Sequence, residues 1–298
     1  MQTQLAAGLL RSEKPYREYV RAMLTANHDN GYDHLELRPC FMPKNALVRE
    51  DGTPWYKEKD GKIMVNEKGE KIKTGNETIM NIIQDELKKW NLANRQNTRK
   101  MTVGIIYCFP RSMSAPEPLR EAMAECIKLK QEFGHLICGM SNKPTSKAFT
   151  HKFAGFDLIG EEDKGKTLYH WREELVRFQY DCGKEKVEIP FLFHCGETKK
   201  RTRESKLEDE EYTTYEDTEG NILDALLLGT KRIGHGWILH ENPLLMKIYA
   251  ERKIAIECPL ISNEILGLTE NASGHQIYKF LEYGLMAVVC NDNPNLTK

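Results

Sequence analysis

The sequence contains no uninterrupted apolar run approaching the length of a membrane-spanning helix, which needs about 20 residues. It also lacks an excess of charge of either sign: the formal net charge is −1, so no overall field attracts nucleic acid or an anionic membrane. The first residues, Met1–Ala7, show no basic segment followed by an apolar one, so no secretory signal is visible. We therefore expect neither nucleic acid nor a membrane among the partners of this chain.

Motifs that pair cysteines are also missing. The sequence has eight cysteines but no C-x-x-C pair of the kind that zinc–thiolate sites usually show. In a chain of 298 residues, this content does not indicate a disulfide scaffold. Cys108, Cys195, Cys258 and Cys290 lie in or at the ends of apolar runs, where a free cysteine behaves as a small hydrophobe. We interpret them as core residues.

What the sequence does contain is a regular alternation of strand-like apolar segments with segments of helical periodicity. The predicted strands are Asp33–Arg38, Met101–Cys108, Phe153–Gly160, Ile189–His194, Arg232–His235, Ile254–Cys258 and Leu285–Asn291. The predicted helices are Pro15–Asn30, Thr78–Asn94, Glu117–Phe133, Thr167–Cys182, Ile222–Gly229, Pro243–Arg252 and Gln276–Tyr283. This alternation indicates a parallel sheet with right-handed crossovers and favours an α/β fold of the TIM (β/α)₈ barrel type.

Two hydrophilic segments interrupt the alternation. Arg49–Asn76 is rich in turn signals, with Asp51-Gly52, Asp60-Gly61 and Lys68-Gly69 marking hairpins. Lys199–Glu219 runs from basic to acidic and is typical of a solvated loop. No strand is predicted before residue 15 or after residue 294. We therefore expect residues 1–298 to form a single incomplete barrel domain that lacks its first strand and its last helix, with insertions at 49–76 and 199–219.

Polar residues follow several of the predicted strands at their carboxyl ends, where parallel α/β barrels place chemistry. His194 supplies an imidazole and Asp292 a carboxylate, and mixed nitrogen and oxygen ligation is usual for catalytic zinc. Glu197 follows His194 closely enough to reach the same substrate without being a ligand. His235 is flanked by glycines, which let a ligand approach the backbone and the ring.

Each of these residues taken singly has an ordinary structural explanation. Asp292, for example, is also suited to an Asx-turn ahead of Pro294. Asp157 and Gly160 belong to a further strand end. The convergence of several strand ends on one barrel mouth is what indicates a functional site.

The ordered motifs of the chain carry a resemblance to a known family. They are GFDLIGEED (Gly155–Asp163), FHCGET (Phe193–Thr198), NILDALLLGTKRIGHG (Asn221–Gly236), ECPLISN (Glu257–Asn263) and CNDNP (Cys290–Pro294). In these motifs the sequence resembles the adenosine/AMP deaminase family of metal-dependent hydrolases, within it the adenosine-deaminase-related growth factor branch. The resemblance extends from about Leu9 to Pro294, and LELR at Leu35–Arg38 is similar to the second barrel strand of the family.

The resemblance implies a zinc-dependent hydrolysis of adenosine, and of 2′-deoxyadenosine, with adenosine giving inosine and ammonia. It implies that His194 and Asp292 are zinc ligands. Glu197 would donate a proton to N1 of the purine, and His235 would orient the zinc-bound water and help remove its proton.

The resemblance also implies three substrate contacts. The backbone at Gly160 would contact N3 of the purine, and Asn293 stands where the family has an aspartate that contacts N7. An asparagine amide can donate a hydrogen bond to that nitrogen. Asp157 is a further predicted substrate-binding residue.

This sequence departs from the family pattern in its metal ligands. The first strand of the family carries H-x-H, which supplies two further zinc ligands, and no H-x-H occurs in this sequence. His194 and Asp292 alone are fewer than the three protein ligands of a usual catalytic zinc site. A smaller departure is that the family's C-P-x-S-N is one residue longer in Cys258–Asn263.

Three readings of function therefore stay open: an adenosine deaminase, an impaired fragment or pseudoenzyme that binds purine nucleosides, and an AMP deaminase. The implied partner is a small purine nucleoside, and the family branch implies a possible homodimer. That branch is usually secreted, whereas no signal peptide is visible here, so the compartment is left open.

Overall fold

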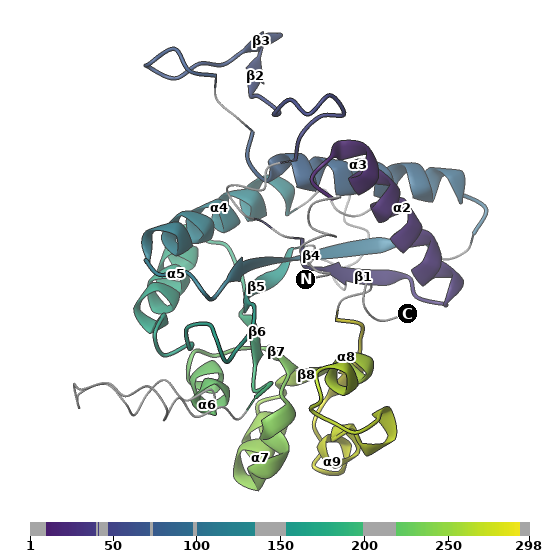
Figure 1. Cartoon of the computed structure of the whole chain (residues 1–298), viewed down its shortest axis with the longest axis vertical. Coiled ribbons are helices and arrows are strands. Elements are labelled where there is room, and N and C mark those ends of the chain that lie inside the picture. Colours follow the sequence, from purple (N-terminus) through teal and green to yellow (C-terminus); the bar gives the residue numbers. More distant parts are fainter. Residues whose placement is uncertain are drawn as a thin grey trace. The chain divides into compact units, whose positions relative to one another are not determined.

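The computed structural model describes residues 10–39, 41, 47–71, 74–97, 100–134, 153–198 and 219–292 (Figure 1). The chain divides into two compact units. The first comprises Met1–Tyr107 and Lys128–Ala154, and the second comprises Cys108–Ile127 and Gly155–Lys298. All the predicted site residues belong to the second unit. Whether the chain is a single domain stays a prediction.

The first unit contains two long helices and a parallel strand pair. Its elements are α2 (Glu13–Asp29), β1 (His34–Leu37), α3 (Glu77–Ala93) and the start of β4 (Thr102–Pro110). In the pairing of β1 with β4, His34 lies opposite Thr102 and Leu37 opposite Ile105. The buried Glu86 of α3 joins the two helices, because it accepts hydrogen bonds from Arg17 at 2.8 Å and Arg21 at 2.5 Å.

The hydrophilic insertion of the first unit contains the hairpins that its turn signals predicted. Strands β2 (Glu58–Lys59) and β3 (Lys62–Ile63) pair antiparallel around Asp60-Gly61. Isolated antiparallel bridges join Val48 to Pro54 and Val65 to Lys71, around the other two predicted turns. Of the second predicted insertion, residues 199–218 lie outside the described residues.

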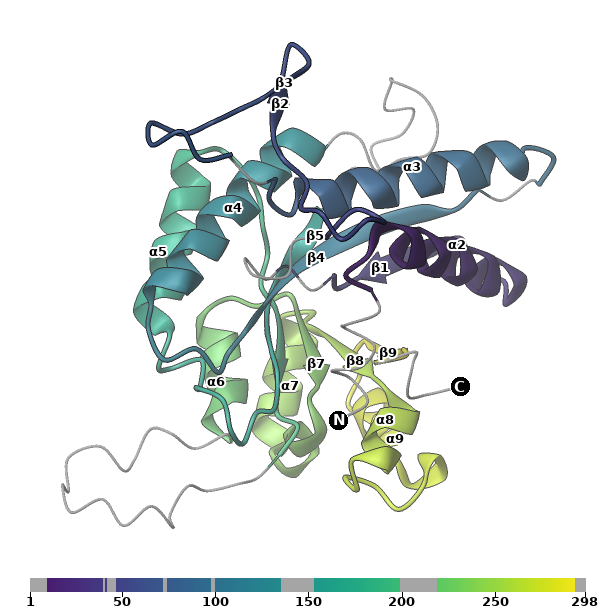
Figure 2. The ribbon, with the colours of Figure 1, turned by 45° about the horizontal axis from the view of Figure 1, so that its top comes forward.

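The second unit contains a four-stranded parallel sheet in the order β6-β7-β8-β9 (Figure 2). These strands are β6 (Leu192–Cys195), β7 (Arg232–His235), β8 (Ala255–Cys258) and β9 (Ala287–Val289). The remaining strand, β5 (Phe153–Ile159), follows β4 in the sheet β1-β4-β5. Cys195 lies opposite His235 in the register of β6 and β7, so the ends of these strands come together.

Helices and short 3₁₀ turns follow the strands in chain order. They are α4 (Glu117–Phe133), α5 (Arg172–Lys184), α6 (Gly220–Leu227), η3 (Trp237–Glu241), α7 (Pro243–Glu251), α8 (Leu260–Ile265), η4 (Ala272–Gly274) and α9 (Ile277–Glu282). The start of α7 shows how the sequence sets a boundary. Pro243 occupies the first turn, and the side chain of Asn242 accepts a hydrogen bond from the backbone N–H of Leu245 at 3.0 Å.

Aromatic residues form much of the core around β5 and β6. The rings of Phe191 and Phe193 lie 4.6 Å apart between centroids, and those of Phe156 and Phe178 lie 5.0 Å apart. All four are buried. Such packing explains why these strands read as nearly continuous apolar runs, since a strand covered on both faces has no polar side.

The seven predicted strands and seven predicted helices are all present. Two boundary predictions were wrong by three residues or more. Helix α5 begins at Arg172 and not at Thr167, because residues 168–171 form turns, and β6 begins at Leu192 and not at Ile189. The prediction that the cysteines are core residues is confirmed for Cys108, Cys195 and Cys258, which are buried, whereas Cys290 is partly exposed. None of the helices within the described residues combines the length and apolarity needed to cross a bilayer.

Candidate active site

His194, near the end of β6, is fixed by a buried carboxylate. Asp157 of β5 accepts a hydrogen bond from the backbone N–H of His194 at 2.8 Å, and its other oxygen lies 2.6 Å from Nδ1 of the ring. The side chain of Asp157 is completely buried. Because a carboxylate accepts from Nδ1–H, Nε2 of His194 keeps its lone pair, which is the arrangement found in metal-binding histidines.

His235 ends β7 in an unusual backbone conformation. Its φ is +63°, in the left-handed region that few residues other than glycine adopt. Nδ1 of its buried ring lies 2.7 Å from the side-chain amide of Asn263. The other nitrogen, Nε2, lies 3.6 Å from Oε1 of Glu197 and 3.8 Å from Oδ2 of Asp292. A residue with a strained backbone at a strand end, and with a ring that faces two carboxylates, is typical of a functional site.

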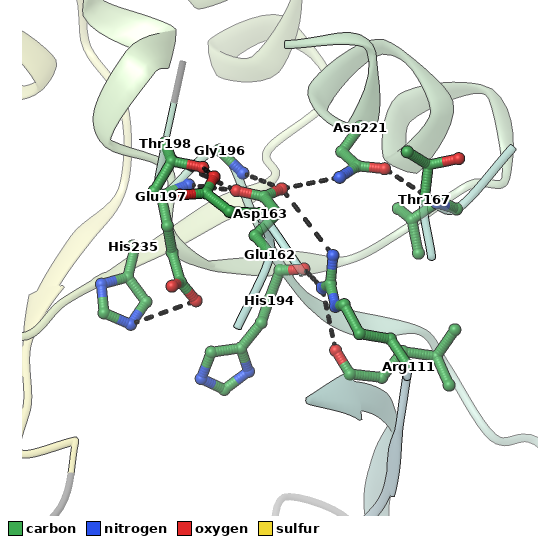
Figure 3. A network of polar contacts seen from close by, with 12 residues as sticks. Arg111, Glu162, Asp163, Thr167, His194, Gly196, Glu197, Thr198, Asn221 and His235 are labelled. Atoms are coloured by element: carbon green, nitrogen blue, oxygen red, sulfur yellow. Dashed lines mark hydrogen bonds and ion pairs between the residues drawn. The ribbon is translucent and has the colours of Figure 1, made fainter. Parts of the chain in front are cut away.

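His194, Glu197 and His235 form a cluster whose candidate ligand atoms all lie within 4.8 Å of one another. Figure 3 shows these three side chains on the same side of the buried Glu162. Imidazole nitrogen and carboxylate oxygen are both ligands that zinc accepts, so this donor set fits a zinc ion. The structure therefore brings together three of the residues that the strand ends predicted.

Asp292 lies beside this cluster. Its Oδ2 accepts a hydrogen bond from the hydroxyl of Ser262 at 2.7 Å and lies 3.8 Å from Nε2 of His235. One third of its side chain is exposed, at 33%. A zinc ion shared by His194 and Asp292 stays a prediction.

The segment after His194 is held by a carboxylate that the sequence did not single out. Glu162 accepts hydrogen bonds from three consecutive backbone N–H groups, those of Gly196 at 2.9 Å, Glu197 at 2.7 Å and Thr198 at 3.3 Å (Figure 3). The amide of Asn221 also donates to it, at 2.7 Å. Both oxygens of Glu162 therefore act as acceptors, and the backbone that carries Glu197 is fixed by them.

A buried arginine completes this network. Arg111, which follows β4, donates hydrogen bonds to the carbonyl oxygens of Leu158, at 3.0 Å, and His194. Its guanidinium lies 3.8 Å from Oε1 of Glu162, and both side chains are almost wholly buried. Burial raises the pKa of Glu162, an effect opposed by Arg111 and by the N–H of Gly196. Arg111 thus holds the backbone at His194, and Glu162 holds the residues that follow it.

The adjacent thiol is not part of the candidate chemistry. Burial raises the pKa of Cys195 well above its ordinary value, with a further contribution from Glu162. A thiol that resists ionisation is a poor metal ligand and a poor nucleophile. Its position agrees with the interpretation of Cys195 as a small core residue.

The three residues predicted to contact the substrate have different environments in the structure, and one of them is not described. Gly160 directly follows β5, has a φ of +110° and is exposed, so its backbone is accessible. Asp157 is buried, and both of its oxygens contact His194, so it orients that ring. Its direct contact with a substrate stays a prediction. Asn293 lies outside the described residues.

Sequence reasoning missed the supporting residues of the site. Glu162 lies in the motif GFDLIGEED and Asn263 in the motif ECPLISN, and this position in a motif was the one signal in the sequence that could have identified them. Arg111 lies in none of the motifs, although it follows a predicted strand closely. Their roles depend on contacts between distant segments, such as the 83 positions that separate Arg111 from His194.

Comparison with known proteins gives the site a context. Residues 212–298 match the family model described as adenosine deaminase. Adenosine deaminase 2 of Homo sapiens is 36% identical over 291 residues, which cover 97% of this chain and 45% of the human protein. The chain thus spans less than half the length of that relative.

Solved structures show the fold. Adenine deaminase from Arthrobacter aurescens matches with a TM-score of 0.59 and 17% identity, over 97% of this chain and 67% of that chain. An amidohydrolase from Burkholderia ambifaria with bound zinc matches with a TM-score of 0.57, over 96% of this chain and 60% of that chain. That match has 16% sequence identity, so, like the first, it shows the fold alone. They confirm the predicted α/β fold of the TIM-barrel type.

Proposed function

Because the chain belongs to the adenosine deaminase family, we propose that it carries out, or contributes the central site for, zinc-dependent hydrolytic deamination of adenosine and 2′-deoxyadenosine. The products from adenosine would be inosine and ammonia. The observation that carries this proposal is the cluster of His194, Glu197 and His235, whose ligand atoms lie within 4.8 Å of one another. A homodimer, which the family branch implies, stays a prediction.

Glu197 has the role of proton donor in this proposal. Its backbone N–H is held by the buried Glu162 at 2.7 Å, so the position of the side chain depends on a fixed segment. Transfer of a proton from Glu197 to N1 of the purine would withdraw electron density from C6 and favour attack by water there. Proton transfer by a positioned side chain contributes typically 10²–10⁴-fold to a rate.

His194 and Asp292 are the residues proposed to hold zinc. Asp157 supports this role, because its hydrogen bond to Nδ1 of His194 leaves Nε2 with a lone pair. A zinc ion, when bound, supplies a water molecule of lowered pKa that serves as the nucleophile. His235 and Glu197 would orient that water and the purine, respectively.

A second candidate function rests on the missing H-x-H motif. With fewer protein ligands than a usual catalytic zinc site, this sequence also fits a protein that binds a purine nucleoside without converting it. The two functions share the same site and differ in metal content and turnover. They can therefore be separated by measurement on one preparation.

The test uses the purified chain. It measures the zinc content by elemental mass spectrometry, nucleoside binding by calorimetry, and the release of ammonia from adenosine. Stoichiometric zinc with ammonia release supports the deaminase. Adenosine binding without ammonia release supports the second function. A chain that neither binds adenosine nor releases ammonia overturns both.

A further inference from the structure

Three buried side chains form a continuous relay behind His235. Asn263 of α8 lies between two imidazoles: one end of its amide is 2.7 Å from Nδ1 of His235, and the other end is 2.7 Å from Nε2 of His275. His275 lies between η4 and α9. All three residues are at most 2% exposed, so water does not compete for these contacts. The hydrogen positions in the relay are therefore determined by the residues themselves.

The first step is the protonation of His275. The backbone N–H of Ile277 donates a hydrogen bond to Nδ1 of His275 at 3.0 Å. Burial lowers the pKa of His275, with further contributions from His235 and His240, and this favours the neutral ring. A neutral imidazole that accepts at Nδ1 carries its single proton on Nε2. Nε2 of His275 is therefore a donor and needs an acceptor.

The second step is the orientation of Asn263. Its amide is the group that faces Nε2 of His275, and only the amide oxygen can accept that hydrogen. The oxygen and nitrogen of an asparagine amide are alike in size and shape, and both contacts measure 2.7 Å, so either orientation fits. Hydrogen-bond pairing therefore selects the orientation with the oxygen toward His275 and the NH₂ group toward His235.

The third step concerns the site. We infer that His275, acting through Asn263, is a positioning residue that keeps the proton of His235 on Nε2. An Nδ1 that receives a hydrogen from the amide carries none of its own. The Nε2–H of His235 then faces Glu197, at 3.6 Å, and Asp292, at 3.8 Å, as a hydrogen-bond donor.

This inference rests on the proposed function only for its catalytic consequence, and it changes one predicted role. With its proton on Nε2, His235 has no lone pair there for a metal ion and cannot accept a proton from the attacking water. It can instead donate to an oxygen or a carboxylate beside it. Of the clustered residues His194, Glu197 and His235, the last is then the least suited to ligate zinc.

Long-range ¹H–¹⁵N NMR of the histidine-labelled chain tests the inference directly, because it distinguishes the two neutral forms of an imidazole. The His235→Gln variant identifies the signals of residue 235. We expect both His235 and His275 to carry their proton on Nε2. A proton on Nδ1 of either ring would overturn the relay. This readout needs neither zinc nor deaminase activity, so its failure is distinct from failure of the proposed function.

Variants separate positioning from mere packing. Asn263→Asp replaces the amide donor with an acceptor, so the proton of His235 should move to Nδ1. His275→Leu should let His235 populate both forms, whereas His275→Gln supplies an N–H near the position of Nε2 and should preserve the native form. If His275→Leu leaves His235 wholly in the Nε2 form, His275 has no positioning role. For a chain active as a deaminase, Asn263→Asp should lower kcat about 10²–10⁴-fold with little change in KM.

Discussion

Glu162 accepts a hydrogen bond from the backbone N–H of Glu197 at 2.7 Å, although 35 positions separate the two residues in the sequence. One carboxylate thus fixes the segment from which the other, the proposed proton donor, extends. The same carboxylate lies 3.8 Å from the buried guanidinium of Arg111. Glu162 therefore contributes both to the buried ion pair and to the position of the proposed proton donor.

The first prediction concerns the stability of this network. Glu162→Gln leaves the buried Arg111 without a counter-charge and turns one acceptor oxygen into a donor that faces N–H groups. Breaking a buried pair by removing one partner typically costs 3–5 kcal/mol, and we expect a loss of about that size in the free energy of unfolding. Denaturant titration followed by circular dichroism measures it.

The neighbouring Glu161 provides the matched control. Its side chain is 69% exposed and pairs with Lys164 on the surface. Glu161→Gln should therefore change the unfolding free energy by no more than about 0.5 kcal/mol. Equal effects of the two substitutions would contradict the role given to Glu162.

The second prediction concerns zinc. Asp157→Asn removes the charge that fixes His194 and its tautomer, and loss of such a partner typically lowers metal affinity 10–100-fold. Competition with a chromophoric chelator measures the affinity. Asp181→Asn on α5, where the side chain is 44% exposed, is the control. If both variants bind zinc as the native chain does, His194 is not a ligand of the kind proposed.

The third prediction concerns Glu197. Glu197→Gln keeps the backbone contact to Glu162 and the shape of the side chain, but the amide cannot deliver a proton to N1 of the purine. We expect kcat for adenosine to fall about 10²–10⁴-fold, while nucleoside binding persists. Steady-state kinetics with calorimetry measure both quantities. Undiminished turnover would remove Glu197 from the mechanism.

The fourth prediction concerns pH. The pKa of His275 is lowered in the folded chain, chiefly by burial, from the ordinary value of 6.5. The unfolded chain therefore binds more protons at this position, and the stabilisation associated with neutral His275 is present above pH 6.5 and lost as the pH falls through the folded-state pKa. Unfolding free energies measured from pH 7.5 down to about 5 should decline more steeply for the native chain than for His275→Gln. Parallel declines would show that His275 is protonated without penalty.

Much of the fold could be predicted because it depends on local patterns. The order of strands and helices follows from apolar runs and helical spacing, and Pro243 with Asn242 marks a helix start by its own chemistry. The grouping of His194 with His235 also followed, since parallel strands place their carboxyl ends at one edge. The supporting contacts of Arg111 and Asn263 did not, because each depends on which distant segment its side chain reaches.

Glu161, Glu162 and Asp163 show where the limit lies. The sequence by itself determined that three acidic residues follow the strand that ends at Ile159. Only the tertiary structure decided their different environments. Glu161 is exposed and pairs with Lys164, whereas Glu162 is buried and accepts hydrogen bonds from the N–H groups of residues 196–198. Asp163 accepts a hydrogen bond from the hydroxyl of Thr198. The physical reason is that carboxylates adjacent in sequence have the same local chemistry, and their environments differ only once the rest of the chain is folded around them.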